Sequence, residues 1–258
     1  MENVTISVIV CAHNEESYIG KCLSALRNAL QGLPNKVIVV ADRCNDRTVE
    51  IARHYSAKII EKNWKVWRNS YSESLQVGYL NADGKYIGIV DADVVVSPNF
   101  FKDLIPLIRG EIVSVSAQVM TYPDTFLNKL MNAWERTYYF APLGKAPYGA
   151  VRIILKRALD EIGGFRDVPT PDTDIDIRFA RKGYRSIESK KVKAYHIRHI
   201  TIKKIIDGQI NCGRGRYALG IGLARTIGHS IVRFRPLVVY GWFLERQISN
   251  LKNKSSQI

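Results

Sequence analysis

The sequence predicts an α/β protein with a mostly parallel, twisted sheet flanked by helices and a basic helical C-terminal tail. Two observations lead to this prediction. Short runs rich in Val and Ile alternate with helical patterns through residues 5–90, and clusters of polar residues follow several of the apolar runs. A chain of 258 residues is long enough for one large α/β domain or two closely packed lobes.

The first half of the chain supplies the clearest elements. Runs of β-branched residues predict four buried strands, at 5–11, 36–41, 58–61 and 85–90. Apolar residues at three- and four-residue spacing predict the helices between them, at 19–30, 48–54 and 72–80. This strand–helix–strand order is typical of a parallel sheet covered by helices, in which ligands bind at the carboxyl ends of the strands.

The regular alternation of expected strands and helices ends after Pro98. Alternating or apolar runs predict further strands at 111–120, 148–155 and 191–195. Helical patterns cover 125–140, the segment from 156 to Gly163-Gly164, and 173–182. In the helix at 125–140, large apolar side chains recur every four residues, which favours a core-facing stripe: Phe126, Leu130, Trp134 and Tyr138.

Charge is distributed unevenly along the chain. Residues 1–177 hold 20 Lys and Arg against 21 Asp and Glu, whereas residues 178–258 hold 18 against 3, which accounts for the net charge of +14. This asymmetry indicates a polyanionic partner such as substrate phosphates, anionic lipid or nucleic acid; a solvated basic face is the alternative. No apolar run is long enough to span a membrane and the start lacks a signal-peptide pattern, so we expect a cytoplasmic protein. The four cysteines have no metal-binding or disulfide spacing.

Polar clusters follow three of the expected strands, at 13–16, 42–46 and 91–93. Because the carboxyl ends of parallel strands meet at one edge of a sheet, these clusters can face one crevice. Asp91 and Asp93 point the same way if the chain stays extended, and buried carboxylates need a compensating partner. Carboxylate oxygens suit Mg²⁺ or Mn²⁺. The alternative is an Asp-capped turn before Pro98.

Five ordered blocks carry a resemblance to a known family: VIVCAHNEESYIGKCL, VIVVADRCNDRTVEIA, GKYIGIVDADVVV, the GA and GGF of YGAVRIILKRALDEIGGF, and TPDTDIDIRFARKGY. Together they resemble the inverting glycosyltransferases of family 2, which have the GT-A fold. The resemblance implies a GT-A domain at 1–217, with a nucleotide-binding half at 1–97 and an acceptor half at 98–217. Residues 218–258 then form the basic, apolar tail.

The resemblance also implies roles in donor binding. Asp91 and Asp93 match the family's DxD motif, which holds a divalent cation, Mn²⁺ or Mg²⁺, against the diphosphate of the donor. Asn14, Glu15 and Asp42 fall where the family contacts the base and ribose. From the residues alone, Asp42 can instead cap its turn, and Asn14 and Glu15 can start the following helix.

Basic residues complete the implied donor site. Arg68 lies near a position where the family often carries a basic residue. His196 follows the last expected strand, where some relatives place a metal-binding histidine, although a histidine there is often structural. Arg214 and Arg216, in QINCGRGRY, loosely match a family motif that closes over the diphosphate.

The general base is expected at Asp172, which matches the acid of the family's ED motif. It would remove the proton of the acceptor hydroxyl during attack on the anomeric carbon. Pro171 replaces the usual Glu, which leaves Asp174 as a second candidate. The alternative is that Asp172 caps the helix at 173–182, with Asp174 and Asp176 interacting with its dipole.

We therefore expect transfer of a sugar, with inversion, from a UDP- or GDP-sugar to a saccharide or lipid-linked acceptor. One alternative is a sugar nucleotidyltransferase, but CAHNEES stands where its Gly-rich phosphate loop is expected. A nucleic-acid-binding protein using the basic tail is the other, and it leaves Asp91, Asp93 and Asp172 without a role. No nucleic acid partner is expected.

The tail mixes cations with large apolar side chains, a composition that suits the surface of an anionic membrane. The residues concerned are Arg225, Ile231, Arg233, Phe234, Arg235, Val238, Tyr240, Trp242, Phe243 and Arg246. Packing of these aromatic residues against the catalytic domain or a second subunit is the alternative.

Overall fold

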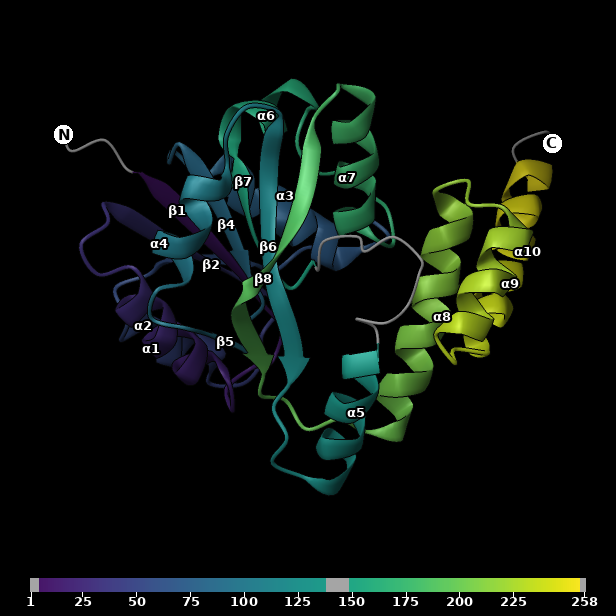
Figure 1. Ribbon diagram of the computed structural model, residues 1–258, viewed down its shortest axis with the longest axis horizontal. Helices are drawn as coiled ribbons and strands as arrows, with labels where there is room; N and C mark the ends of the chain where they lie inside the picture. The colour runs from purple at the N-terminus through teal and green to yellow at the C-terminus, as the bar shows by residue number, and fades with distance from the viewer. Residues whose placement is uncertain (1–4, 138–148, 256–258) are drawn as a thin grey trace. The chain divides into compact units, whose positions relative to one another are not determined.

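The computed structural model describes residues 5–137 and 149–255 (Figure 1). The strands are β1 Ile6–Ala12, β2 Asn35–Asp42, β3 Lys58–Lys62, β4 Tyr86–Val90, β5 Val94–Val96, β6 Ile112–Thr121, β7 Val151–Leu155 and β8 Arg185–His196. The helices are α1 Ile19–Ala29, α2 Thr48–Arg53, α3 Ser70–Leu80, α4 Phe100–Leu104, the 3₁₀ helix Ile105–Leu107, α5 Phe126–Thr137, α6 Lys156–Glu161, α7 Pro171–Arg181, α8 Ile202–Ala218, α9 Leu223–Val232 and α10 Leu237–Ser255. The expected end of the helix at 138–140 and the expected strand start at 148 lie outside the described residues.

The described strands form one mixed sheet in the order β3-β2-β1-β4-β7-β6-β8-β5. Strands β3, β2, β1 and β4 run parallel, as do β6 and β8, whereas β7 is antiparallel to both of its neighbours and β5 to β8. The expectation of a mostly parallel sheet flanked by helices is confirmed. The parallel half places the ends of β2, β1 and β4 side by side.

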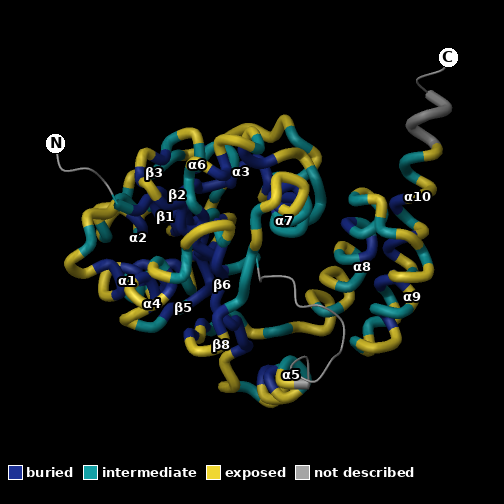
Figure 2. Tube along the Cα trace, turned by 45° about the horizontal axis from the view of Figure 1, so that its top comes forward, coloured by how far each residue is buried: buried dark blue, intermediate teal, exposed yellow. Residues whose placement is uncertain are grey.

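Two apolar layers cover the sheet. Along β1, Val8 and Val10 belong to the cluster with α1, α2 and α4, whereas Ile9 belongs to the cluster with α3, α6 and α7. This follows from the two-residue alternation of side chains on a strand. Figure 2 shows the buried residues concentrated along the central strands. Burial on both faces explains why the strand sequences read as continuous Val- and Ile-rich runs.

The chain divides into two compact units, each described by itself. Among the described residues, unit 1 comprises 5–122, 149–167 and 171–198 and contains the whole sheet, while unit 2 comprises 123–137, 168–170 and 199–255. The domain boundary expected after residue 217 falls near the end of α8, inside unit 2, and stays a prediction.

Unit 2 is helical, as expected for the tail. Its helices α8 and α10 pack closely through two glycines. A Cβ at Gly213 would lie 2.0 Å from the Val238 carbonyl oxygen, and one at Gly241 would lie 2.1 Å from the Ile210 carbonyl oxygen. Any larger residue at either position would force the helices apart.

The orientation of α5 differs from the prediction. Phe126 and Leu130 are 75% and 53% exposed, so the expected core-facing stripe is wrong for these two residues; Tyr138 lies outside the described residues. Asn128 and Asn132 are buried instead. Asn128 accepts from the Ile200 N–H and donates to Asp124, which satisfies its amide inside the unit.

Candidate functional site

The ends of the parallel strands enclose a cavity of about 390 Å³ in unit 1. Side chains from β1, β2, α3, the turn after β4 and the end of β8 line it, together with residues of the loops that follow these strands. Five residues predicted from the sequence meet there: Glu15, Asp42, Asp91, Asp93 and His196. A volume of this size lies within the usual range for small-molecule sites.

Asp91 and Asp93 stand between β4 and β5 and have different partners. Asp91 Oδ1 accepts from the Tyr71 hydroxyl at 2.8 Å. Asp93 Oδ2 accepts from Arg198 Nε at 2.7 Å, and His196 Nδ1 lies 3.4 Å from Asp93 Oδ1. Each carboxylate is therefore held by neighbouring side chains, while both face the cavity.

These surroundings shift the pKa values of the two acids in opposite directions. Burial, and next the charge of Asp93, raises the pKa of Asp91 to about 6. Burial also acts to raise the pKa of Asp93, but the hydrogen bond and charge of His196 and the charge of Arg198 outweigh it, so this pKa is lowered. Burial raises the pKa of Tyr71, which stays protonated and able to donate. The pair thus contains one carboxylate, Asp91, that is hydrogen-bonded to a neutral hydroxyl, in a setting of oxygen ligands that Mg²⁺ and Mn²⁺ prefer.

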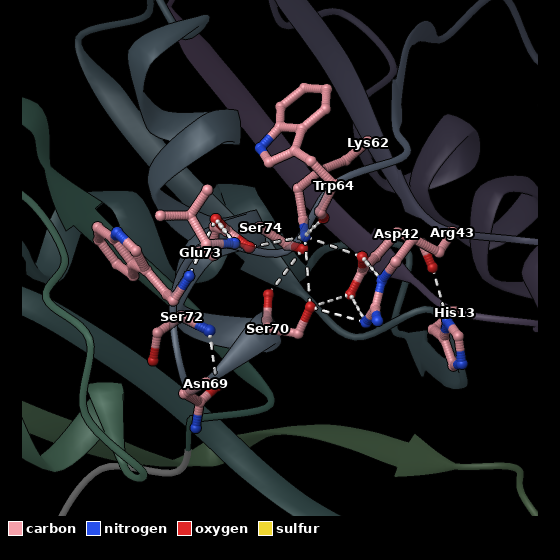
Figure 3. Close-up of polar contacts among 12 residues, drawn as sticks. His13, Asp42, Arg43, Lys62, Trp64, Asn69, Ser70, Ser72, Glu73 and Ser74 are labelled. Carbon is pink, nitrogen blue, oxygen red and sulfur yellow. Dashed lines mark hydrogen bonds and ion pairs between the residues drawn. The ribbon is translucent and has the colours of Figure 1, made fainter.

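Asp42, at the end of β2, belongs to a polar network that Figure 3 shows. Its Oδ1 lies 2.8 Å from both Arg43 Nε and Lys62 Nζ. Its Oδ2 accepts from Arg43 and from the Ser70 hydroxyl. Burial acts to raise the pKa of Asp42, but these hydrogen bonds lower it. Four donors occupy this carboxylate, so its main effect on the cavity is to orient Arg43 and Ser70, which also line it.

Lys62 is the buried centre of this network. Its side chain is fully buried, and its Nζ lies 2.9 Å from Glu73 Oε2 and donates to the Trp64 carbonyl at 2.9 Å. Glu73 also accepts from two backbone N–H groups of the segment before α3. The strand β3, the loop after it and α3 are thereby tied to Asp42.

Asn14 and Arg68 are not among the residues that line the cavity. Asn14 has a φ of 55° and its side-chain oxygen accepts from the Asn45 N–H, which holds two strand-end loops together. The backbone N–H groups of Arg68 and Asn69 donate to Asp167, at 2.8 Å each. The donor-binding roles of Asn14 and Arg68 stay predictions.

Asp172 lies in the first turn of α7, next to Gly149. A Cβ at Gly149 would lie 2.8 Å from Asp172 Cβ and 2.9 Å from its Oδ2, so the absence of a side chain makes room for the acid. The adjacent Ala150 carbonyl accepts from the Asp91 N–H at 2.9 Å. Burial raises the pKa of Asp172, with the charge of Arg152 opposing this. Asp172 is near enough to Asp91 for its charge to raise that pKa as well.

The other acids of α7 are committed to ion pairs. Asp174 is buried and accepts from Arg166 and Arg178, the latter at 2.7 Å. Asp176 forms a paired contact with the buried guanidinium of Arg152, at 3.0 and 3.1 Å. This geometry favours Asp172 over Asp174 as the acid available to a substrate.

Arg214 and Arg216 belong to unit 2 and make contacts inside it. Arg214 Nε lies 2.9 Å from a carboxylate oxygen of Glu245, which is buried. Arg216 donates to the Thr226 hydroxyl at 3.1 Å and to the Arg225 carbonyl at 2.9 Å. Their expected role over the diphosphate stays a prediction.

Sequence reasoning missed Lys62, Tyr71 and Arg198. Tyr71 and Lys62 carry no local signal, because one lies in a polar helix start and the other at a strand end. Arg198 did carry a signal. It stands two residues after His196, so the same alternation that linked Asp91 with Asp93 would have placed it beside that histidine.

Within residues 5–137 and 149–255, no three His, Cys, Asp or Glu side chains converge closely enough to hold a metal ion in this conformation. Among the helices in the same residues, none is long and apolar enough to cross a membrane.

Comparisons with known proteins identify the family. Residues 7–159, more than half of the chain, match Glycosyl transferase family 2. A dolichol-phosphate mannosyltransferase of Pyrococcus furiosus is 31% identical over 106 residues, covering 41% of this chain and 30% of that protein. The chain spans about a third of the length of the curated relatives it matches.

Solved structures share the fold. A mannosyltransferase from Pyrobaculum calidifontis in complex with GDP-Man and Mn²⁺ superposes with a TM-score of 0.65 at 20% identity, over 92% of this chain and 69% of that chain. Glucosyl-3-phosphoglycerate synthase from Mycobacterium tuberculosis, in complex with Mn²⁺, UDP and phosphoglyceric acid, gives a TM-score of 0.60 at 20% identity, over 80% of this chain and 74% of that chain. The expected GT-A fold is confirmed, and the chain belongs to glycosyl transferase family 2.

Proposed function

We propose that the protein transfers a sugar, with inversion, from a nucleotide-diphosphate sugar to a hydroxyl acceptor. The observation that carries this proposal is the meeting of Glu15, Asp42, Asp91 and Asp93 in one strand-end cavity of a family 2 chain. Relatives of the same fold were solved with GDP-Man or with UDP, which supports a UDP- or GDP-sugar as donor.

Asp91 and Asp93, with His196 beside them, are the residues that would hold Mn²⁺ or Mg²⁺. The donor set fits, because two carboxylates share the cavity and the side-chain hydrogen bond of Asp91 comes from the neutral hydroxyl of Tyr71. A bound divalent ion would supply positive charge against the diphosphate as negative charge develops on it. Solved relatives contain Mn²⁺ or Mg²⁺ together with UDP, which supports this assignment.

Asp172 is the proposed general base. Its carboxylate takes the proton of the acceptor hydroxyl while the hydroxyl oxygen bonds to the anomeric carbon. The bond from that carbon to the diphosphate breaks on the opposite face, and the nucleoside diphosphate leaves with the electron pair. Burial beside Gly149 supports this role, because it raises the pKa of Asp172 from that of an ordinary exposed acid.

A panel of nucleotide sugars tests the proposal. With Mn²⁺ or Mg²⁺ present, the true donor at about 100 times its Kd should stabilise the protein by about 2.7 kcal/mol, or roughly 5–10 °C in Tm. NMR of the transferred sugar should show an inverted anomeric configuration. Failure of every donor to stabilise the protein or to be hydrolysed, with and without metal, would contradict the proposal.

We also propose that unit 2 contacts the anionic cytoplasmic face of a membrane, where a lipid-linked acceptor would be found. The turn between α9 and α10 supports this: Phe234 has a φ of 49° and is 79% exposed between Arg233 and Arg235. The turn is held by the Arg235 N–H donating to the Ser230 carbonyl and by the Ser230 hydroxyl donating to the Arg235 carbonyl. A strained turn that keeps an aromatic side chain in solvent is typical of a binding surface.

Other side chains of α9 and α10 are exposed as well. Ile231 is 69% and Tyr240 56% exposed, and Arg225 and Arg246 are exposed cations. Two apolar residues of the tail named in the sequence analysis, Val238 and Trp242, are buried inside the unit and so do not belong to this surface. Relatives named dolichol-phosphate mannosyltransferase and dolichyl-phosphate beta-glucosyltransferase support a lipid-linked acceptor.

Sedimentation with vesicles tests the membrane proposal. Phe234→Ser should weaken binding to phosphatidylserine vesicles roughly 10-fold or more, the loss expected for one buried aromatic side chain. Leu80→Ser is the matched control, because Leu80 is 70% exposed in unit 1. No binding of the unmodified protein at low salt, or equal loss in both variants, would reject the surface.

A further inference from the structure

Arg198 bridges two of the acids of the donor cavity. Its Nε lies 2.7 Å from Asp93 Oδ2, its terminal nitrogen donates to Glu15 Oε1, and its guanidinium stacks over the Tyr18 ring at 5.5 Å. The backbone just before it is fixed, because the Ile197 N–H donates to the Asp93 carbonyl at 2.9 Å. The side chain itself is 29% exposed and lines the cavity.

A divalent ion on Asp93 Oδ2 would disturb this arrangement. A Mg²⁺ ligand distance is about 2.1 Å, so an ion on Oδ2 would lie within about 5 Å of the guanidinium nitrogen that donates to the same atom. Two cations at that separation in a partly buried site repel each other strongly. Arg198 and an ion on Oδ2 would therefore compete for Asp93.

Arg198 has a second partner available when it leaves Asp93. A guanidinium carries a permanent charge on a long stem, and its planar donors match phosphate oxygens in a two-point contact. The cavity it lines is the one in which the proposed donor's diphosphate would bind. Because the Ile197 N–H is hydrogen-bonded to the Asp93 carbonyl, the Arg198 side chain can change partner while the backbone stays in place.

We propose that Arg198 is an exchangeable counter-ion: it neutralises Asp93 and Glu15 in the empty cavity, yields Asp93 to the divalent ion, and then binds the diphosphate. This inference rests on the proposed function. Its consequence is strong positive coupling, in which the metal binds weakly alone and tightly with the nucleoside diphosphate. The nucleotide and the metal thus bind cooperatively.

Calorimetry with Mn²⁺ alone, and with UDP and GDP in the absence and presence of Mn²⁺, tests the exchange. Arg198→Gln should bind Mn²⁺ alone roughly 5- to 150-fold more tightly than the unmodified protein, the usual range of coupling between two ligands. With saturating Mn²⁺, it should bind the nucleoside diphosphate roughly 10-fold more weakly, because a charged hydrogen-bond partner is lost. Arg198→Lys keeps the charge without the planar donors, so it should leave the affinity for free Mn²⁺ low and weaken only nucleotide binding.

Arg53→Gln is the matched control. Arg53 is an exposed arginine in unit 1 that lies 2.7 Å from a carboxylate oxygen of Glu61, and its loss should change neither affinity. A measurement without substitution supplements the variants: in the unmodified protein, the NMR signal of the Arg198 Nε–H should shift when Mg²⁺ and nucleotide are added together and stay in place with Mg²⁺ alone.

The outcomes separate this inference from the proposed function. If the unmodified protein binds both ligands but Arg198→Gln binds Mn²⁺ no more tightly, the exchange is wrong and the function stands. It is also wrong if the Arg198 signal does not move, or if the nucleotide binds equally well without metal. If the unmodified protein binds neither Mn²⁺ nor nucleoside diphosphate under any condition, both are overturned.

Discussion

Replacing Lys62 by Met tests whether the buried network behind Asp42 holds unit 1 together. Lys62 is fully buried between Asp42 and Glu73, at 2.8 and 2.9 Å from their carboxylate oxygens. Removing one partner of a buried ion pair costs about 3–5 kcal/mol, because a charge is left uncompensated. Asp42 keeps Arg43, and Glu73 keeps two backbone N–H donors, so we expect the lower end, about 3 kcal/mol.

Thermal unfolding followed by circular dichroism measures this loss. A cost of about 3 kcal/mol corresponds to a decrease in Tm of roughly 6–12 °C for a protein of this size. Lys58→Met is the matched control, because Lys58 is exposed and its ammonium donates to the Asn81 side chain at 2.7 Å. We expect its effect to stay within about 0.5 kcal/mol.

The pH dependence provides a second readout. Burial acts to raise both pKa values, but hydrogen bonds outweigh it: those from Arg43 and then Lys62 lower the pKa of Asp42, and those from Lys62 and two backbone N–H groups lower that of Glu73. Carboxylates with lowered pKa values contribute stability that is complete above the unfolded values and is lost as the pH falls through the folded values. The gap in Tm between the unmodified protein and Lys62→Met should therefore narrow on acidification below about pH 4.5. A loss under 1 kcal/mol, or a gap that widens with acid, would refute the reasoning.

Three further predictions concern the proposed chemistry. Asp93→Ala should abolish metal-dependent nucleotide binding in calorimetry, whereas Asp103→Ala, an exposed acid on α4, should retain it. Asp172→Asn should lower the transfer rate by roughly 10²–10⁴ with unchanged donor affinity. The acid limb of the unmodified enzyme's pH–rate profile should lie above pH 3.8, because burial raises the pKa of Asp172, and an unaltered limb in the variant would exclude it as base. Gly149→Ala should displace Asp172 and lower the rate by roughly 10², with donor binding retained; full activity would contradict the close contact.

The sequence predicted most of the fold that positions the cavity, because its signals are local. Buried parallel strands are continuous β-branched runs, and the polar residues that follow them lie at one edge of the sheet by topology. Asp42, Asp91 and Asp93 were therefore placed together correctly. Strand β5, only Val94–Val96, was missed because it is too short to show alternation and is defined by its pairing with β8.

Other features depend on tertiary contacts that no local pattern contains. The apolar stripe of α5 predicted a buried face, yet two asparagines are buried because their amides find partners within unit 2. The role of Asp42 also depends on distant residues, since Lys62 and Ser70 lie 20 and 28 positions away along the chain. The sequence showed the acids of the site but not the cations that hold them.

Two of those cations, Lys62 and Arg198, differ in how far their side chains are buried. Lys62 is fully enclosed and held by two carboxylates and a carbonyl, so its removal should lower stability first. Arg198 is 29% exposed at the open cavity, on a stem long enough to turn, so its removal should change metal affinity more than stability. Both neutralise acids at the same strand edge. Only the one in contact with the cavity can exchange its acid for a substrate phosphate, and this difference makes one cation structural and the other functional.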